Sequence, residues 1–412
     1  MRAAPSTRWV VLGVALAIQT STSIVASALP VLLPLLKAEF HLSFAAAGLL
    51  SNFSFLGAFL TIAAAGWAVD ALGDRFVLVL GGLVAGGAAL LSAVAPTFSL
   101  ILVVLLLMGA GTATSTPAGS IAVRTAFPLH MRGMVMSLRQ TGIPLGGFFA
   151  ALILPSIALA GGWRAAIAAA GAAAVVVALV GLAIYRSGPR PVQAEGDSGS
   201  LLRVMTRDLR IAAVAGLLLV AGQMSLLTYV VTYLIHDRGL AITTAALLLA
   251  LAQLGGVTGR VLWGVVSDRL LGGRRRSALL LAAGTGALAS LLLSALPGST
   301  PLPLLVAVVV ACAVGAVGWN GVQISFLSEL ARPGSEGRAV GLALMIQQPG
   351  ILAGPFLFGL MVDLTGSFRP AWLLLAVFLG LAMLVLLAVH ELPHAVVSPP
   401  LGGGVPAKPG RG

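Results

Sequence analysis

Charge is scarce in this sequence. Only 9% of its 412 residues are charged, whereas 59% are hydrophobic, and a soluble domain carries about 25% charged residues. The core of a soluble protein cannot bury so much apolar surface, so most of this chain must be surrounded by lipid. Apolar stretches of roughly 18 or more residues recur throughout, each long enough to cross a bilayer as a helix. The composition therefore predicts an all-α membrane protein.

Three kinds of chemistry have no support in the sequence. Cys312 is the only cysteine, so no disulfide can form within the chain. No glycine-rich loop followed by Lys and Ser or Thr is present, which argues against an ATP-driven pump. The five histidines fall in loops or at span ends, and no catalytic pairing occurs. We expect a protein that is not an enzyme, with no cofactor, no metal site and no nucleic-acid partner.

Twelve membrane spans can be placed, with one long polar insertion after the sixth. The predicted N-terminal bundle covers residues 1–185, a cytoplasmic linker with a short basic amphipathic helix covers 186–210, the C-terminal bundle covers 211–390, and a disordered tail covers 391–412. The predicted spans are Trp9–Leu36, Phe44–Val69, Phe76–Ala95, Leu100–Phe127, Gly133–Ala160, Trp163–Tyr185, Ile211–Ile235, Thr243–Ser267, Ser277–Leu296, Leu302–Leu330, Ala339–Val362 and Ala371–His390.

The basic residues are distributed unevenly across this map. Of the 24 Lys and Arg residues, 18 fall on the side that holds both termini and four on the opposite side. Positively charged loops stay in the cytoplasm, so we expect both termini to be cytoplasmic and the protein to lie in a bacterial inner membrane. Arg139 and Arg260 are left over, because both fall inside predicted helices.

The two halves on either side of the linker resemble each other. Weak as each match is alone, together they indicate a duplicated six-helix unit, in which a substrate site lies between two bundles near the bilayer midplane. The matches are Gly66–Asp70 with Gly264–Asp268, Gln19–Ser21 with Gln223–Ser225, and Gly161–Arg164 with Gly366–Arg369, at offsets of 198, 204 and 205 residues.

The loops after spans two and eight carry the most specific motif. Each is a glycine turn with a carboxylate that can pair with nearby arginines: Asp70 and Arg75 in the first copy, Asp268 and Arg269 in the second. This pattern resembles the loop signature of the major facilitator superfamily, once per half, and the resemblance covers nearly the whole chain. It implies twelve helices in two pseudo-symmetric six-helix bundles, with these four residues in a cytoplasmic latch between the halves.

Two departures from family patterns matter. Ala71 and Asp74 stand in the first loop where basic residues are usual, which suggests a weaker first latch. Drug–proton antiporters of the superfamily carry an arginine on span four, where the matching residue here is Leu105. Gly142 and Gly146 resemble the antiporters' span-five motif only loosely, and close helix packing is the simpler interpretation.

Arg260 is the strongest candidate for a substrate ligand. A guanidinium at its depth is costly unless it faces water or an anion, and no span contains a carboxylate at matching depth. Gln253 shares its helix face. Span eight resembles that of oxalate:formate antiporters and monocarboxylate transporters, where an arginine binds the substrate carboxylate. The chain departs from these branches at Gln347 and Gln348, where the oxalate branch has a second cation, and at Gly256, where the proton-coupled branch often has a carboxylate. The alternative is a structural arginine bonded to backbone carbonyls.

The other polar residues within the spans are weaker candidates. Arg139 either reaches back to the cytoplasmic headgroups or lines the cavity, and the rest either line it or join helices. The remaining substrate-binding candidates are Gln19, Gln223, Tyr229, Asn320, Gln323 and Asn52.

The sequence therefore predicts a monomeric secondary transporter that works by alternating access. Its best substrate is a small organic or inorganic monoanion such as a monocarboxylate, because one buried cation is available. Drug efflux is the main alternative, and a non-transporting membrane receptor is the distant one. Membrane lipid is the other expected partner.

Overall fold

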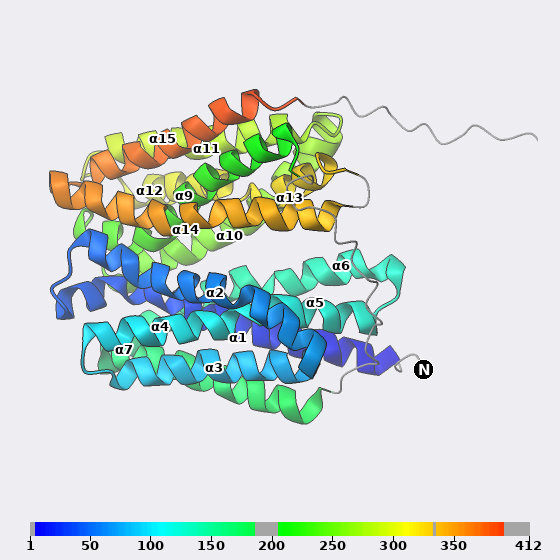
Figure 1. Cartoon of the computed structure of the whole chain (residues 1–412). Helices are drawn as coiled ribbons and strands as arrows, with labels where there is room; N and C mark the ends of the chain where they lie inside the picture. Colours follow the sequence, from blue (N-terminus) through cyan, green and yellow to red (C-terminus); the bar gives the residue numbers. More distant parts are fainter. Residues whose placement is uncertain (1–4, 186–204, 333–334, 391–412) are drawn as a thin grey trace, which may run out of the picture.

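Long apolar helices make up almost all of this protein. The computed structural model describes residues 5–185, 205–332 and 335–390, and no strand occurs within those residues. A helix satisfies its own backbone hydrogen bonds, which the hydrocarbon core of a membrane cannot do. The helices form two layers in Figure 1, the first half of the chain below and the second half above. The start of α1 and the end of α15 lie at one end of the molecule, which we call the terminal end, and the opposite end is the distal end.

The first layer holds six spans, two of which are interrupted. Span four is divided at Thr114, and span five is divided at Thr141. The elements of this half are α1 (Pro5–Glu39), α2 (Phe44–Leu72), α3 (Asp74–Val94), α4 (Phe98–Ala113), α5 (Ser115–Ala126), α6 (Leu129–Gln140) and α7 (Gly142–Ile184).

The second layer repeats this arrangement with six further spans. Span ten is divided after Ala316, as span four is divided after Ala113. The elements of this half are α9 (Arg207–His236), α10 (Ile242–Val265), η1 (Val266–Leu270), α11 (Arg275–Ala295), α12 (Leu302–Ala316), α13 (Asn320–Glu329), α14 (Glu336–Thr365) and α15 (Phe368–Leu387).

The predicted twelve-span, two-bundle fold is confirmed, although only 11 apolar stretches long enough to span are separate in the described residues. Spans five and six run together as one stretch of 51 residues, Met134–Ile184. Gly162 interrupts it with φ of 77°, a left-handed conformation that glycine adopts without strain. The turn falls in the predicted Gly161–Arg164 loop, so the two spans fold back on each other.

The predicted amphipathic helix is only partly within the described residues. Residues 186–204 lie outside them, and α9 already begins at Arg207. Thr206 caps this helix by accepting a hydrogen bond from the Leu209 backbone N–H at 3.2 Å. Arg207 and Arg210 therefore belong to the first turn of span seven. The predicted tail, residues 391–412, lies outside the described residues.

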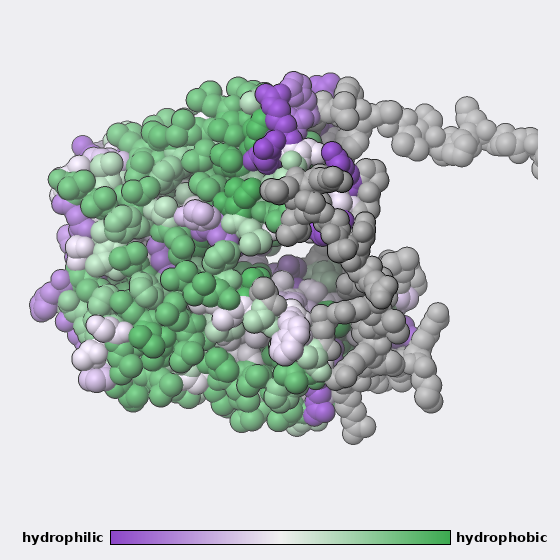
Figure 2. Space-filling view, viewed as in Figure 1, coloured by the Kyte–Doolittle hydropathy of each residue, from purple (hydrophilic) through white to green (hydrophobic). Residues whose placement is uncertain are grey.

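Within the described residues, three helix pairs make most of the contact between the two halves. α2 packs against α14, α7 against α10, and α1 against α9. The outer surface is largely apolar, as the hydropathy view shows (Figure 2), and carries exposed Leu, Val and Ile side chains that suit a lipid solvent. The same view shows a hollow between the halves at the terminal end. The halves thus meet at one end and separate toward the other.

Candidate functional site

The distal end is closed by a carboxylate that joins the halves. Asp363, near the end of α14, accepts hydrogen bonds from the backbone N–H groups of Phe44 and Ala45, each at 2.7 Å. Those groups are at the start of α2, where helical N–H groups have no partner of their own. Ser43 accepts from a third, that of Ala46. An acid from the second half therefore completes the N-terminal cap of a helix in the first half.

Two predicted substrate ligands belong to this seal. Tyr229 is fully buried, donates its hydroxyl to the Phe44 carbonyl, and stacks on Phe358 with ring centroids 5.0 Å apart. Asn52 donates its side-chain amide to the Leu352 carbonyl of α14. Both side chains are committed to contacts between the halves in this state. The sequence carries no signal for these pairs, because their members are 185 and 300 residues apart.

The break in span ten is supported by side-chain donors. Where the helix is interrupted, the Val314 carbonyl accepts from the Trp263 indole at 2.9 Å, and the Ala316 carbonyl accepts from the Trp319 indole at 2.8 Å. The Asn320 amide donates to the Val317 carbonyl at 3.0 Å. Backbone that leaves the helix in a membrane needs such partners. Trp319, which the sequence places at midspan, therefore stabilises the interruption.

Arg260 lies on the helix that packs against this break. A Cβ added at Gly256 would lie 2.7 Å from Val317 Cγ1, and one at Gly259 would lie 3.0 Å from Gly318 Cα. The Arg260 side chain is partly buried. Its Nε has no hydrogen-bond partner, and no carboxylate in the described part of the chain pairs with it. Its guanidinium remains available to an anion.

Gln253 of α10 contacts α7 of the first half. A Cβ added at Gly147 of α7 would lie only 2.2 Å from Gln253 Nε2, so the amide occupies the notch that this glycine leaves. Arg260 follows Gln253 by seven residues toward the terminal end, and Arg139 of α6 precedes Gly147 of α7 by eight residues along the facing span, across its break at Thr141. At about 1.5 Å per residue, both arginines lie about 10–12 Å from this contact on its terminal side. They are thus at similar depth, one in each half.

Arg139 is enclosed within the first half. It is 0% exposed, so it does not reach the headgroups as one of the two sequence interpretations proposed. Its Nη1 donates to Gln19 Oε1 at 3.0 Å and to the Ser115 carbonyl at 3.3 Å, and its Nη2 donates to Ser120 Oγ at 3.2 Å. The side chain lies against Gly119, where a Cβ would be 2.9 Å from Nη1. Arg139 therefore joins α1, α5 and α6, and in this state it cannot touch a ligand.

The second half holds two pairs of amide side chains. Asn320 donates to Gln223 Oε1 at 2.8 Å. Gln323 donates to the Ala212 carbonyl at 3.3 Å, and the Gln323 and Gln347 amides both lie over Gly216 of α9. Gln323 is thus engaged within its own half, whereas Gln223 and Asn320 form a pair beside the span-ten break.

The latch loops differ from each other. Arg275 donates to Asp268, to Glu329 Oε1 at 3.1 Å and to Ser267 Oγ at 3.0 Å, so Asp268 pairs with Arg275 rather than with the exposed Arg269. This cluster lies entirely within the second half.

In the first loop, the Asp70 side chain lies outside what the structure describes. Arg75 donates to the Leu182 carbonyl. The unusual Asp74 is buried and accepts from the Tyr185 hydroxyl, which explains an acid at a position where bases are usual.

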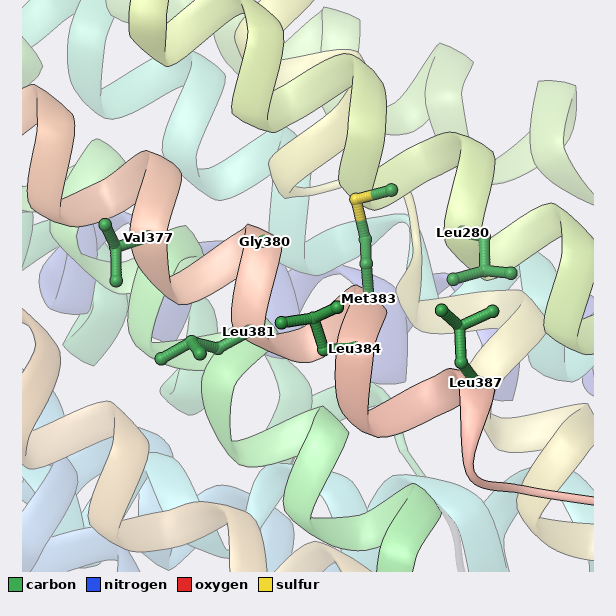
Figure 3. A pocket seen from close by; sticks show the side chains of 7 residues that line it. All are labelled: Leu280, Val377, Gly380, Leu381, Met383, Leu384 and Leu387. Carbon is green, nitrogen blue, oxygen red and sulfur yellow. The ribbon is translucent and has the colours of Figure 1, made fainter.

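A separate hollow lies away from these groups, between α11 and α15. Its lining is wholly apolar, and several of its side chains are exposed on the outer surface, so lipid chains can fill it (Figure 3). It is lined by Leu280, Val377, Gly380, Leu381, Met383, Leu384 and Leu387.

Comparisons with known proteins agree with this architecture. A family model described as Major Facilitator Superfamily matches residues 15–355. An uncharacterized MFS-type transporter of Mycobacterium tuberculosis is 31% identical, covering 94% of this chain and 86% of its own length. The solved structure of a bacterial homolog to the human lysosomal transporter Spinster has a TM-score of 0.77 at 18% identity, covering 93% of this chain and 97% of that one.

More distant relatives carry substrate names. A probable sulfoacetate transporter of Cupriavidus necator is 26% identical, covering 87% of this chain and 88% of its own. A hexuronate transporter of Bacillus subtilis is 24% identical (91% and 92%). Monocarboxylate transporter 13 of Bos taurus is 27% identical (78% and 74%). All three names denote organic acids.

Proposed function

Because this chain belongs to the major facilitator superfamily, whose members here are transporters rather than enzymes, we propose that it carries a small organic anion, such as a monocarboxylate, by alternating access. The observation that supports this most directly is the guanidinium of Arg260 in a membrane-spanning helix, for which the described residues supply neither a carboxylate nor a hydrogen-bond acceptor. A bidentate carboxylate matches that group in both shape and charge.

The position of Arg260 fits a ligand role. It lies on the terminal side of the Gln253–Gly147 contact, and the halves separate toward that end (Figure 2). Its side chain is only partly buried, and we assign it to the wall of the hollow between the halves. An anion bound to it would neutralise a charge that is otherwise costly inside a bilayer. The organic acids in the names of three relatives agree with this choice.

Orientation and switching complete the proposal. With 18 of the 24 basic residues on the side of the termini, we place both termini in the cytoplasm, so that the hollow opens inward. The Asp70–Arg75 and Asp268–Arg269 loops lie at that end, and we assign them to the latch that would close it in the opposite state. Asp363 holds the distal end closed in this state.

Drug efflux remains the second candidate. It would use an apolar cavity, and the apolar hollow of Figure 3 is the feature in its favour. That hollow opens on the outer surface rather than between the halves, and it includes no polar side chain to orient a drug. The unpartnered Arg260 would then have no role.

The test measures binding and stability on the same purified variants. Arg260→Ala should fold as well as the wild type and lose binding of carboxylates, and Arg260→Lys should bind poorly because an ammonium cannot reproduce the planar fork. Arg274→Ala, an exposed arginine at the terminal end, controls for the change in net charge. Thermal-shift measurements across small carboxylates and cationic dyes give both quantities. Full anion binding by Arg260→Ala would exclude the proposed role and favour drug efflux.

A further inference from the structure

Two glutamines occupy matching positions in the two halves. Gln19 on α1 and Gln223 on α9 are 204 residues apart, the offset of the internal repeat. Both are nearly enclosed, with 5% and 6% of their surface exposed. Each has its side-chain oxygen engaged by a donor from its own half. This shared feature determines what each amide can offer to a ligand.

The orientation of Gln19 follows from its partner. The atom nearest Arg139 Nη1, at 3.0 Å, must be an acceptor, because a guanidinium has donors only. The amide oxygen therefore faces Arg139, and the Nε2 group with its two N–H donors is at the other side. None of the described residues accepts a hydrogen bond from that group. Arg139 is itself fixed by Ser115 and Ser120, so the amide cannot readily turn over.

The orientation of Gln223 follows from a chain of two contacts. The Val317 carbonyl can only accept, so the Asn320 atom that contacts it at 3.0 Å must be Nδ2. The same Nδ2 lies 2.8 Å from Gln223, so the Gln223 atom it meets must be Oε1. The Nε2 group of Gln223 is therefore also left with its donors unused by the residues that the structure describes.

We propose that Gln19, Gln223 and Arg260 form a donor-rich binding site that selects carboxylates with few or no hydroxyl groups. This rests on the proposed function, because it takes Arg260 as the anchor of the anion. The three side chains present N–H donors, because the oxygens of both glutamines already accept from donors of their own half. A ketone or a second carboxylate accepts from these donors. A hydroxyl needs an acceptor as well, and each buried hydroxyl without one weakens binding.

Arg139 then has a role without touching the ligand. It is a positioning residue, because its hydrogen bond decides which end of Gln19 is free. Asn320 does the same for Gln223 with a neutral amide. Removing either positioning group should let its glutamine rotate and present the oxygen instead. Affinity for hydroxylated acids should then rise relative to that for plain acids, which loss of packing alone would not produce.

The experiment uses the full chain in detergent and acids in pairs that differ in hydroxyl groups: acetate with glycolate, pyruvate with glycerate, and succinate with tartrate. For the wild type we expect the member without added hydroxyl groups to bind at least about tenfold more tightly in each pair that binds. Gln19→Met and Gln223→Met should weaken binding of the plain acid and bring this ratio close to one. Asn320→Ala should lower it too, whereas Gln140→Met, an exposed glutamine next to Arg139, should leave it unchanged.

The outcomes separate the two proposals. Acids that bind in an Arg260-dependent manner, with equal affinity for both members of each pair, would overturn the donor-rich site and leave the proposed function intact. An unchanged ratio in Gln19→Met and Gln223→Met would do the same. Failure of all six acids to bind the wild type would count against the proposed function itself.

Discussion

The two halves of this protein each hold one arginine within the membrane, at similar depth, and use it differently. Arg139 in the first half is fully enclosed and donates to Gln19, Ser115 and Ser120. Arg260 in the second half is only partly buried, and no described residue accepts a hydrogen bond from its guanidinium, whereas in Arg139 only Nε is without a partner. Neither pairs with a carboxylate in the described residues. Depth and charge alone therefore do not identify an arginine as a ligand, because the acceptors around its guanidinium decide whether it is available.

The internal repeat allows the surroundings of the two arginines to be compared position by position. The role of Arg139, holding the glutamine of the first span in its half, is taken in the second half by the neutral Asn320. On span eleven, the residue 205 positions after Arg139, the offset of the nearest repeat match, is Leu344. The second half has thus no charge at the equivalent place, and carries its charge on span eight instead. Among the described membrane-spanning residues, Arg260 is therefore the arginine to which neither half supplies an acceptor.

The largest expected effect is on stability, and it separates the two arginines. Arg139→Ala would remove three hydrogen bonds and leave the buried Gln19 Oε1 without its donor, which alone costs about 1–3 kcal/mol. Arg260→Ala removes no hydrogen bond and should leave the free energy of unfolding nearly unchanged. Thermal unfolding of both variants in detergent, compared with the wild type, tests the contrast. Equal losses in the two variants would show that Arg260 is also structural.

The distal seal gives the next effect, on the balance between conformations. Asp363→Asn keeps one acceptor oxygen but removes the charge at the start of α2, where an anion is worth about 0.3–2 kcal/mol. We expect the population with an open distal end to rise up to about 30-fold. Spin labels at the exposed Leu49 on α2 and Leu364 on α14 would report this as a longer distance.

A matched control for the seal is Asp237→Asn. Asp237 also lies at the distal end, but its ion pair is with Arg238 of the same half, at 3.7 Å. Removing its charge should leave the label distances as in the wild type. If both variants open the distal end equally, the effect comes from lost surface charge and not from the cap on α2.

The smallest effect concerns two neighbouring glycines on α7. A Cβ at Gly146 would lie 2.7 Å from the Thr20 carbonyl oxygen and 2.8 Å from the Ile24 nitrogen, so Gly146→Ala pushes against the backbone of α1. Overpacking of this kind costs about 1–3 kcal/mol. Gly147→Ala meets only the end of the Gln253 side chain, which can move. Thermal unfolding should therefore show a clear loss for the first variant and little for the second, and the reverse order would refute the assignment of these contacts.

The sequence predicts the membrane spans better than it predicts the hydrogen-bond partners of individual side chains. The spans, the repeat and the family followed from apolar runs and from the two loop motifs, and the fold and the family match confirm them. The roles of single polar side chains do not follow from the sequence in the same way. Asp363 was simply an acid at the end of a span, and its partners at Phe44 and Ala45 lie 319 and 318 residues away. Their polarity predicts a place in the cavity for Tyr229 and Asn52, yet here both side chains donate hydrogen bonds across the seal.

From the sequence it follows that this chain is a membrane protein with twelve spans, and that two arginines lie within those spans, where a charge is costly. The composition and the length of the apolar stretches are sufficient for these conclusions, because insertion of a helix into a membrane depends mainly on its local apolar content. Which of the two arginines finds acceptors among the described residues depends on the tertiary structure. Hydrogen-bond partners come from helices far apart in the chain, so the acceptors around Arg139 and their absence around Arg260 arise only when the helices pack.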